Sequence, residues 1–224
     1  MSSQSDSEGT SGRSDDGGIV LNAVQGGSAI AEALRRRRSI KMYRPDQIAL
    51  ATMSRLLGEA VGSAPDTRRP YGSAHARYDI QVTVVAAAVD GLDPGAYKYL
   101  PEEHSLAGGV YGDHRTGLAE GTLDAAWLRQ CPLILVLSAD LSAANRAFES
   151  QRASRGESFC WFEAGLVSQN VYLWAAENGL GTVFLGGLDS ARMRSATQLW
   201  LPRSHSVLGM LPVGYPADPE TSAQ

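Results

Sequence analysis

Hydrophobic residues recur with helical spacing in two stretches of the chain. After Pro45, apolar positions follow the i, i+3, i+4, i+7, i+8 template of a one-sided helix, namely Met53, Leu56, Leu57, Ala60 and Val61. Residues 159–177 form a more apolar stretch, with apolar side chains at Phe159, Phe162, Leu166, Val167, Val171 and Trp174. Because these positions cover much of the circumference, we predict a central, buried helix that ends at Gly179.

Other apolar stretches have the alternating or continuous pattern of strands. Strands are predicted at residues 78–89, 133–137, 182–185 and 207–213, and turns at Asp90-Gly91 and Pro94-Gly95. Shorter helices are predicted at 28–38, with Ser28 as its N-cap, at 112–120, and after a cap at Asp189. Strands and helices are intermingled without a regular βαβ repeat, which indicates an α+β layered fold rather than a doubly wound one.

Composition limits the class of protein. The chain has 224 residues, a formal net charge of −4 and a sequence pI of about 5.6. This balance gives no general attraction to nucleic acid or to an anionic membrane. No apolar run approaches the roughly 18 residues of a membrane span, and the N-terminus lacks the pattern of a secretory signal. We therefore expect a cytoplasmic protein with neither nucleic acid nor membrane as a partner.

The ends of the chain differ from its centre. Residues 1–27 are rich in Ser, Gly and Asp, with little to bury, so we predict a disordered tail, one domain over 28–216 and a C-terminal tail over 217–224. Cys131 and Cys160 lie in apolar stretches without metal-ligand spacing. We expect two buried thiols and predict no metal site.

Five cations and one hydroxyl gather where the first helix meets a loop. Residues 35–38 are all Arg, and Ser39 and Lys41 follow. Guanidinium groups and a hydroxyl can bind several oxygens of a phosphate at once. The alternative is a solvated charge run at a helix C-terminus, where the helix dipole favours Arg.

Two glycine-containing loops are candidates for binding a flat ligand. Residues 69–78 place small residues and tyrosines around Ser73, inside a loop that is long for a simple connector. Gly186 and Gly187 lie between a strand and a helix, where backbone N–H groups could donate to a bound ring. The alternatives are a Gly/Ser surface loop and a tight turn. A dinucleotide fingerprint is excluded, because Phe184 stands where its third glycine would be.

Together these motifs resemble the FMN-dependent nitroreductase superfamily, and within it the SagB-type thiazoline/oxazoline dehydrogenase branch. The resemblance covers roughly residues 30–215. It is carried by residues 37–43 (Arg-Arg-Ser-Ile-Lys-Met-Tyr), 71–74 (Tyr-Gly-Ser-Ala), 163–173 (beginning Glu-Ala-Gly), 179–182 with 186–187, and the strand pair of 91–99. The order and spacing of these segments are more specific than any one of them.

The resemblance implies a central mixed sheet flanked by helices, in an intertwined homodimer with two FMN sites at the subunit interface. Carried over by motif, the cofactor-binding residues are Arg37, Arg38, Ser39 and Lys41 at the phosphate and ribityl end, Ser73 and Ala74 along the ring from the partner subunit, Gly186 and Gly187 near N5, and Gln169 and Asn170 close to the site.

The chain also departs from the dehydrogenase branch. Residues 151–159 contain neither the Lys-Tyr nor the Tyr-Arg pair that the branch carries there, and Leu166 replaces a frequent His. If the Lys-Tyr pair moves the proton, this chain uses another base or performs another reaction. His75 is a candidate catalytic base, and the alternative is a loop histidine without a catalytic role. The basic residues with which other nitroreductases bind phosphate near the C-terminus are also absent.

We expect an FMN enzyme that moves a hydride between its substrate and flavin N5. The expected substrate is a small-molecule or peptide-derived heterocycle or amino-acid-derived group that is oxidised in natural-product biosynthesis. Two alternatives stay open: an NAD(P)H-dependent reductase of nitro or quinone compounds, and a non-catalytic scaffold subunit of a peptide-modifying complex.

Overall fold

The computed structural model describes residues 19, 21, 26–66 and 68–217, so the predicted tails over 1–27 and 217–224 lie almost wholly outside the described residues. Residues up to Glu32 and residues from Ala33 onward belong to separate units. In the first unit, the Ser28 hydroxyl accepts the N–H of Ala31 at 3.2 Å. Ser28 is therefore the N-cap of α1 (Ala29–Arg36), as predicted.

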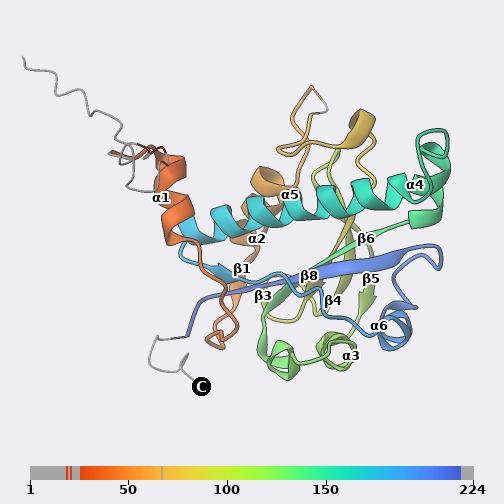
Figure 1. The fold of residues 1–224 in the computed structure, drawn as a ribbon. Helices are drawn as coiled ribbons and strands as arrows, with labels where there is room; N and C mark the ends of the chain where they lie inside the picture. Colours follow the sequence, from red (N-terminus) through yellow and green to blue (C-terminus); the bar gives the residue numbers. More distant parts are fainter. Residues whose placement is uncertain (1–18, 20, 22–25, 67, 218–224) are drawn as a thin grey trace, which may run out of the picture. The chain divides into compact units, whose positions relative to one another are not determined.

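From Ala33 onward, strands and helices alternate irregularly (Figure 1). The strands are β1 (Ile48–Ala49), β2 (Gln81–Ala86), β3 (Val89–Asp90), β4 (Gly95–Leu100), β5 (Ser105–Tyr111), β6 (Leu133–Ala139), β7 (Gly181–Thr182) and β8 (Ser206–Gly214). The helices are α2 (Leu50–Ala60), α3 (Arg115–Glu120), α4 (Leu141–Ala147), α5 (Arg155–Glu177) and α6 (Ser190–Thr197), with two short 3₁₀ helices, η1 (Ala74–Ala76) and η2 (Ala126–Gln130). This order confirms the predicted α+β class.

Six strands form the central sheet, in the order β5-β4-β2-β6-β8-β7. Every neighbouring pair in it is antiparallel. The sheet was expected to be mixed, but parallel pairing in the described chain is limited to β1 with β3 and to a bridge between Ser39 and Thr182 beside β7. Hydrophobic alternation indicates the two faces of a strand but not its direction, which depends on how the chain returns to the sheet.

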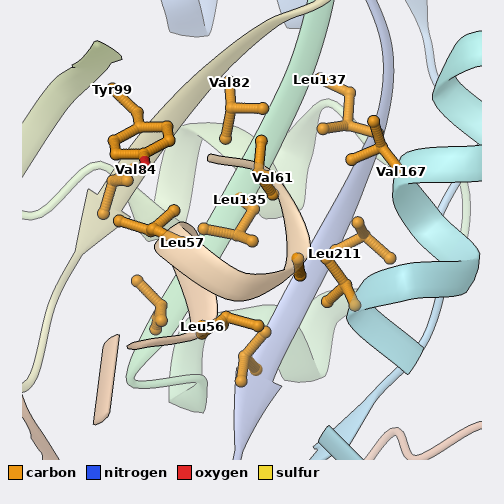
Figure 2. Close-up of a cluster of buried hydrophobic side chains, with 14 of the residues drawn as sticks. Leu56, Leu57, Val61, Val82, Val84, Tyr99, Leu135, Leu137, Val167 and Leu211 are labelled. Carbon is orange, nitrogen blue, oxygen red and sulfur yellow. The ribbon is translucent and has the colours of Figure 1, made fainter. Parts of the chain in front are cut away.

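The sheet separates two hydrophobic cores, and β6 contributes to both. Leu133, Leu135 and Leu137 belong to the core under α2 and α5, and Ile134 and Val136 belong to the core that includes residues of α3 and α6. Figure 2 shows the first core, where side chains of α2, α5 and the sheet meet. A strand that is covered on both faces has a continuously apolar sequence, and the sequence pattern of this segment predicted such an interior strand.

Helix α5 differs from the prediction in its start and in its burial. It begins at Arg155 rather than Phe159. Phe162 is 67% exposed and Leu166 is 46% exposed, so the prediction that the apolar positions over much of the circumference are buried is wrong for these two residues. The buried positions are mainly small, namely Gly156, Cys160, Glu163, Ala164, Val167, Ser168, Val171, Trp174 and Ala175. Small side chains let the helix axis approach its neighbours closely, so the larger apolar residues lie on the outer face.

The boundaries of two predicted strands also differ. The strand predicted from residue 78 begins at Gln81, because Tyr78 has a φ of 53° and belongs to the preceding loop. The strand predicted at 182–185 is reduced to β7, and Leu185 forms an isolated bridge with Met210. Strand β5 and helix α4 were not predicted from the sequence.

Candidate functional site

The predicted site residues from Ala33 onward fall into two groups along α5. One group lies near Tyr172, in the C-terminal half of the helix, and the other lies near Glu163, in the N-terminal half. The two residues are nine positions apart, about 13.5 Å along the helix. In the described chain, no hydrogen bond or ring contact joins Arg37 or Ser39 to the loop around Ser73.

Tyr172 organises the first group. Its ring lies 5.3 Å from the guanidinium carbon of Arg37, and its hydroxyl is 3.4 Å from the Ser39 hydroxyl. The same hydroxyl accepts the backbone N–H of Phe184 at 2.8 Å. One side chain of α5 thus connects part of the basic cluster to the segment that leads to Gly186. Tyr172 was not singled out from the sequence, although it lies inside the motif of residues 163–173.

The four predicted phosphate ligands do not occupy equivalent positions. The Arg38 guanidinium donates to the carbonyl oxygens of Arg35 at 2.6 Å and Arg37 at 2.9 Å, where α1 has ended. It therefore satisfies backbone acceptors that a helix C-terminus leaves open. Lys41 is exposed. Arg37 and Ser39 are the members of the cluster that meet Tyr172.

The paired glycines lie in an exposed, irregular segment after Leu185. A β-carbon added to Gly187 would meet nothing nearer than Leu123, at 3.7 Å, so its backbone is open to a ligand. Gly186 follows Thr182, which lies beside Ser39, by four positions. The Thr182 hydroxyl is buried without a hydrogen-bond partner among the described residues. These features suit a ligand with an anionic group at one end and a flat ring at the other.

The second group is built on a strained loop. His75, Ala76 and Tyr78 each have a φ of 53°, a left-handed conformation that costs a non-glycine residue about 1 kcal/mol or more. The Ser73 hydroxyl accepts the N–H of Tyr78 at 2.8 Å and so closes the loop on itself. Ala74 begins the short helix η1 inside it. A conformation of this cost persists because surrounding contacts hold it.

Glu163 supplies the main contact from α5. Its side chain is 3% exposed and accepts the N–H of Ile80 at 3.0 Å, and it also accepts a hydrogen bond from Ser73. Burial raises the pKa of Glu163 above its ordinary value, and the hydrogen bonds from Ser73 and Ile80 oppose that rise. The sequence signal for this role was a carboxylate inside the most apolar helix, whose other two carboxylates, Glu157 and Glu177, lie near its ends.

The remaining predicted residues lie close to this loop. The Asn170 amide donates to the carbonyl oxygens of Pro70 at 2.9 Å and Ala60 at 3.3 Å, and so holds the start of the loop to α5 and α2. Gln169 is exposed. The exposed His75 ring lies edge-on to Phe148, with ring centroids 5.5 Å apart, and has no contact with Gly186 or Gly187 in the described chain.

Thiol chemistry is not a feature of either group. Cys131 and Cys160 are free and buried, as predicted, and burial raises the pKa of each thiol to about 12. The described residues contain no group of three His, Cys, Asp or Glu side chains placed to hold a metal ion. None of the helices in the described ranges is long and apolar enough to cross a membrane.

The known proteins described next, to which this chain is similar, are nitroreductases. The model of the nitroreductase family matches residues 34–215. A provisionally named nitroreductase of Methanocaldococcus jannaschii is 29% identical over 186 residues, which are 83% of this chain and 90% of that protein.

Two solved structures extend this similarity to the fold. A provisionally named nitroreductase of Anabaena variabilis has a TM-score of 0.71 at 20% identity; the match covers 84% of this chain and spans only 38% of the Anabaena chain. A chain in the Escherichia coli microcin synthetase McbBCD complex, solved with truncated pro-MccB17 bound, has a TM-score of 0.66 at 20% identity and covers 95% of this chain and 80% of that one. At such identities these two structures bear on the fold alone.

Proposed function

The chain belongs to the nitroreductase family, whose members are flavin-dependent oxidoreductases, and from this premise we propose that it binds FMN and moves a hydride between its substrate and flavin N5. The family expected from the sequence motifs is thereby confirmed. Its assignment to the thiazoline/oxazoline dehydrogenase branch stays a prediction, as does the expected cytoplasmic location.

The observation that carries the FMN proposal is the connection through Tyr172. It places Arg37 and Ser39, suited to a phosphate, at one end of a segment whose other end exposes Gly186 and Gly187. FMN, when bound, supplies an acceptor or donor of two electrons and a proton. In this proposal Arg37, Ser39 and Lys41 hold the phosphate, and the N–H groups of the paired glycines orient the ring.

We also propose that the working unit is a homodimer. The outer face of α5 carries three exposed apolar side chains, with Trp161 at 44%, Phe162 at 67% and Leu166 at 46% exposure. Leu166 lies beside the loop, where a β-carbon on Gly72 would be 3.9 Å from its Cδ1. Contiguous exposed apolar side chains indicate an interaction surface. Pairing through this face would bring the Ser73 loop of one subunit toward the other and explain why the two groups do not meet within one chain.

For the substrate we propose a heterocycle or amino-acid-derived group, on a small molecule or a peptide, that is oxidised in natural-product biosynthesis. The support is the resemblance of the sequence motifs to those of the dehydrogenase branch, and the fold shared with a chain of the microcin synthetase complex. His75 remains the proposed base, since it is exposed on the loop that the partner subunit would receive. The alternative is an NAD(P)H-dependent reductase of nitro or quinone compounds, which the family premise equally allows.

The test is the visible absorption spectrum of the purified chain, before and after anaerobic addition of NADH and of NADPH. Flavin bands that survive both additions support a substrate-oxidising dehydrogenase, and bands that bleach support the reductase. A protein without flavin bands, even after reconstitution with FMN, contradicts the proposal and leaves the scaffold alternative.

A matched pair of variants tests the placement of the phosphate. Arg37→Gln should weaken FMN binding about tenfold, because a charged hydrogen bond to phosphate is lost. Arg38→Gln removes the same charge one residue away, but its guanidinium is turned to backbone carbonyls, so a smaller loss is expected. Equal losses for the two variants would indicate a diffuse charge effect and contradict the placement at Arg37.

A further inference from the structure

A cleft at the end of the β2–β4 strand pair lies beside the second group, with which it shares Tyr78 and Ile80. Its volume is about 210 Å³, and its lining includes Arg69, Tyr78, Asp79, Lys98 and Glu102. By comparison, an engineered protein cavity of about 150 Å³ holds one benzene molecule. The cleft therefore has room for a small organic ligand.

Arg69 is the most deeply buried cation of this cleft. Its side chain is only 9% exposed, and its guanidinium carbon lies 4.8 Å from the centroid of the Tyr78 ring. One Nη donates to Glu102 at 2.6 Å and the other to the Tyr71 hydroxyl at 3.3 Å. The Nε atom is buried without a hydrogen-bond partner among the described residues. A guanidinium has five N–H donors, and leaving a buried donor unpaired is costly.

The charges around the cleft favour an anion with a single charge. Its lining has two cations, Arg69 and Lys98, and two carboxylates, Asp79 and Glu102. Asp79 is neutralised from outside the lining, because the Arg77 guanidinium donates to both of its oxygens at 2.9 Å. Among the residues that line the cleft, one positive charge therefore remains in excess; Glu163, a carboxyl of raised pKa that also interacts with Arg69, lies behind the lining. A ligand carboxylate, with one negative charge, balances this single positive charge. A dianion such as phosphate would leave one negative charge unbalanced, and that charge would be repelled by the carboxylate of Glu102.

We propose that this cleft binds the carboxylate of a small organic acid or of a peptide C-terminus, with Arg69 as its main ligand and Lys98 as a second cation. The cleft shares Tyr78 with the loop of Ser73 and His75, so an occupied cleft would also lie against that loop. Binding of this kind does not require bound flavin.

The experiment is an NMR titration of the full chain that follows the Nε–H signal of Arg69, assigned through its own side-chain carbons. The probes are N-acetylglycine, which carries a carboxylate, glycine, which adds an ammonium group, and N-acetylglycinamide, which has no charge. We expect the signal to shift at millimolar N-acetylglycine and to stay in place with the amide. A response to glycine in preference to N-acetylglycine would identify a free amino acid as the ligand. The reverse would identify a carboxylate without a neighbouring ammonium group, and a stronger response to N-acetylglycylglycine than to acetate would then favour a peptide C-terminus over a simple organic acid.

Neighbouring arginines provide the matched variants. Arg69→Gln should abolish the titration seen at the backbone amides around the cleft, and Lys98→Gln should weaken it about threefold. Arg68→Gln is the control, because the Arg68 side chain is 82% exposed and bound to Asp66. If Arg69→Gln does not fold, the titrations of the unsubstituted chain with N-acetylglycine and N-acetylglycinamide still test whether the cleft binds a carboxylate. Equal shifts with acid and amide, or no shift with any probe, overturn the proposal.

Discussion

The two halves of α5 support the candidate site in different ways. The N-terminal half holds the strained loop through the buried carboxylate of Glu163, and it turns Phe162 and Leu166 outward. The C-terminal half uses neutral or exposed groups: Tyr172 bonds to Phe184, and the Trp174 indole donates to Glu59 at 2.6 Å. A buried charge is expensive to replace, while a hydroxyl can be removed at a smaller cost. The first half is therefore the more sensitive to substitution, and the second the more tolerant.

The largest effect is expected when Glu163 is shortened. Glu163→Ala removes the acceptor of the Ile80 N–H and leaves that buried donor unpaired beside a cavity, so we expect a loss of about 3 kcal/mol in the free energy of unfolding. Urea denaturation followed by circular dichroism measures it. A loss below about 1 kcal/mol would show that the loop keeps its conformation without α5.

Glu163→Gln is the control, because its amide oxygen can still accept one hydrogen bond and a loss near 1 kcal/mol is expected. It also isolates the effect of charge. Burial raises the pKa of Glu163, so the folded chain binds that proton more tightly than the unfolded chain does. The stability of the unsubstituted protein, compared with Glu163→Gln, should therefore fall as pH rises from the ordinary range of a carboxyl through its raised pKa.

An intermediate effect is expected on the outer face of the same half. Phe162→Arg places a charge in the proposed subunit interface and should raise the dimer dissociation constant about thirtyfold, or about 2 kcal/mol. Sedimentation velocity over a range of concentrations measures it. Leu199→Arg is the matched control, because Leu199 is 74% exposed but lies after α6. If both variants remain dimers, or if the unsubstituted chain is a monomer, the face of α5 is not the interface.

The smallest effect is expected in the C-terminal half. Tyr172→Phe keeps the ring under Arg37 but removes the hydroxyl that accepts the Phe184 N–H, at a cost of about 1 kcal/mol. Because that hydroxyl also meets Ser39, FMN affinity should fall about fivefold, as measured by fluorescence titration. An FMN affinity equal to that of the unsubstituted chain would mean that Tyr172 supports the fold and not the ligand.

The sequence predicted those elements whose local pattern is unambiguous. Helix α2 has the predicted buried residues, β6 is the interior strand expected after Pro132, and the Asp189 side chain accepts the N–H groups of Ala191 and Arg192 as the cap of α6. Periodicity and capping chemistry act over a few residues, so they can be recognised without knowledge of the tertiary fold.

The rest depended on contacts between distant segments. Hydrophobicity assigned Phe162 to the core, yet it is exposed while Glu163 beside it is buried, because the loop of residues 73–80 supplies hydrogen bonds to the carboxylate. The position of the basic cluster could be predicted, but the different roles of its members could not, since the sequence does not show that the Arg38 guanidinium donates to a carbonyl of its own helix. The roles assigned to Ser73, His75 and the paired glycines toward a cofactor stay predictions.

The place of β6 in the sheet also has a consequence for how the chain folds. Its neighbours are β2, about fifty positions earlier, and β8, about seventy positions later. The backbone groups along one edge of this largely apolar strand therefore stay unpaired until residues 206–214 have been synthesised. Pairing over such sequence distances is slow, and an unpaired apolar edge attracts other strands. We therefore expect the nascent chain to be prone to aggregation in the interval between synthesis of β6 and synthesis of β8.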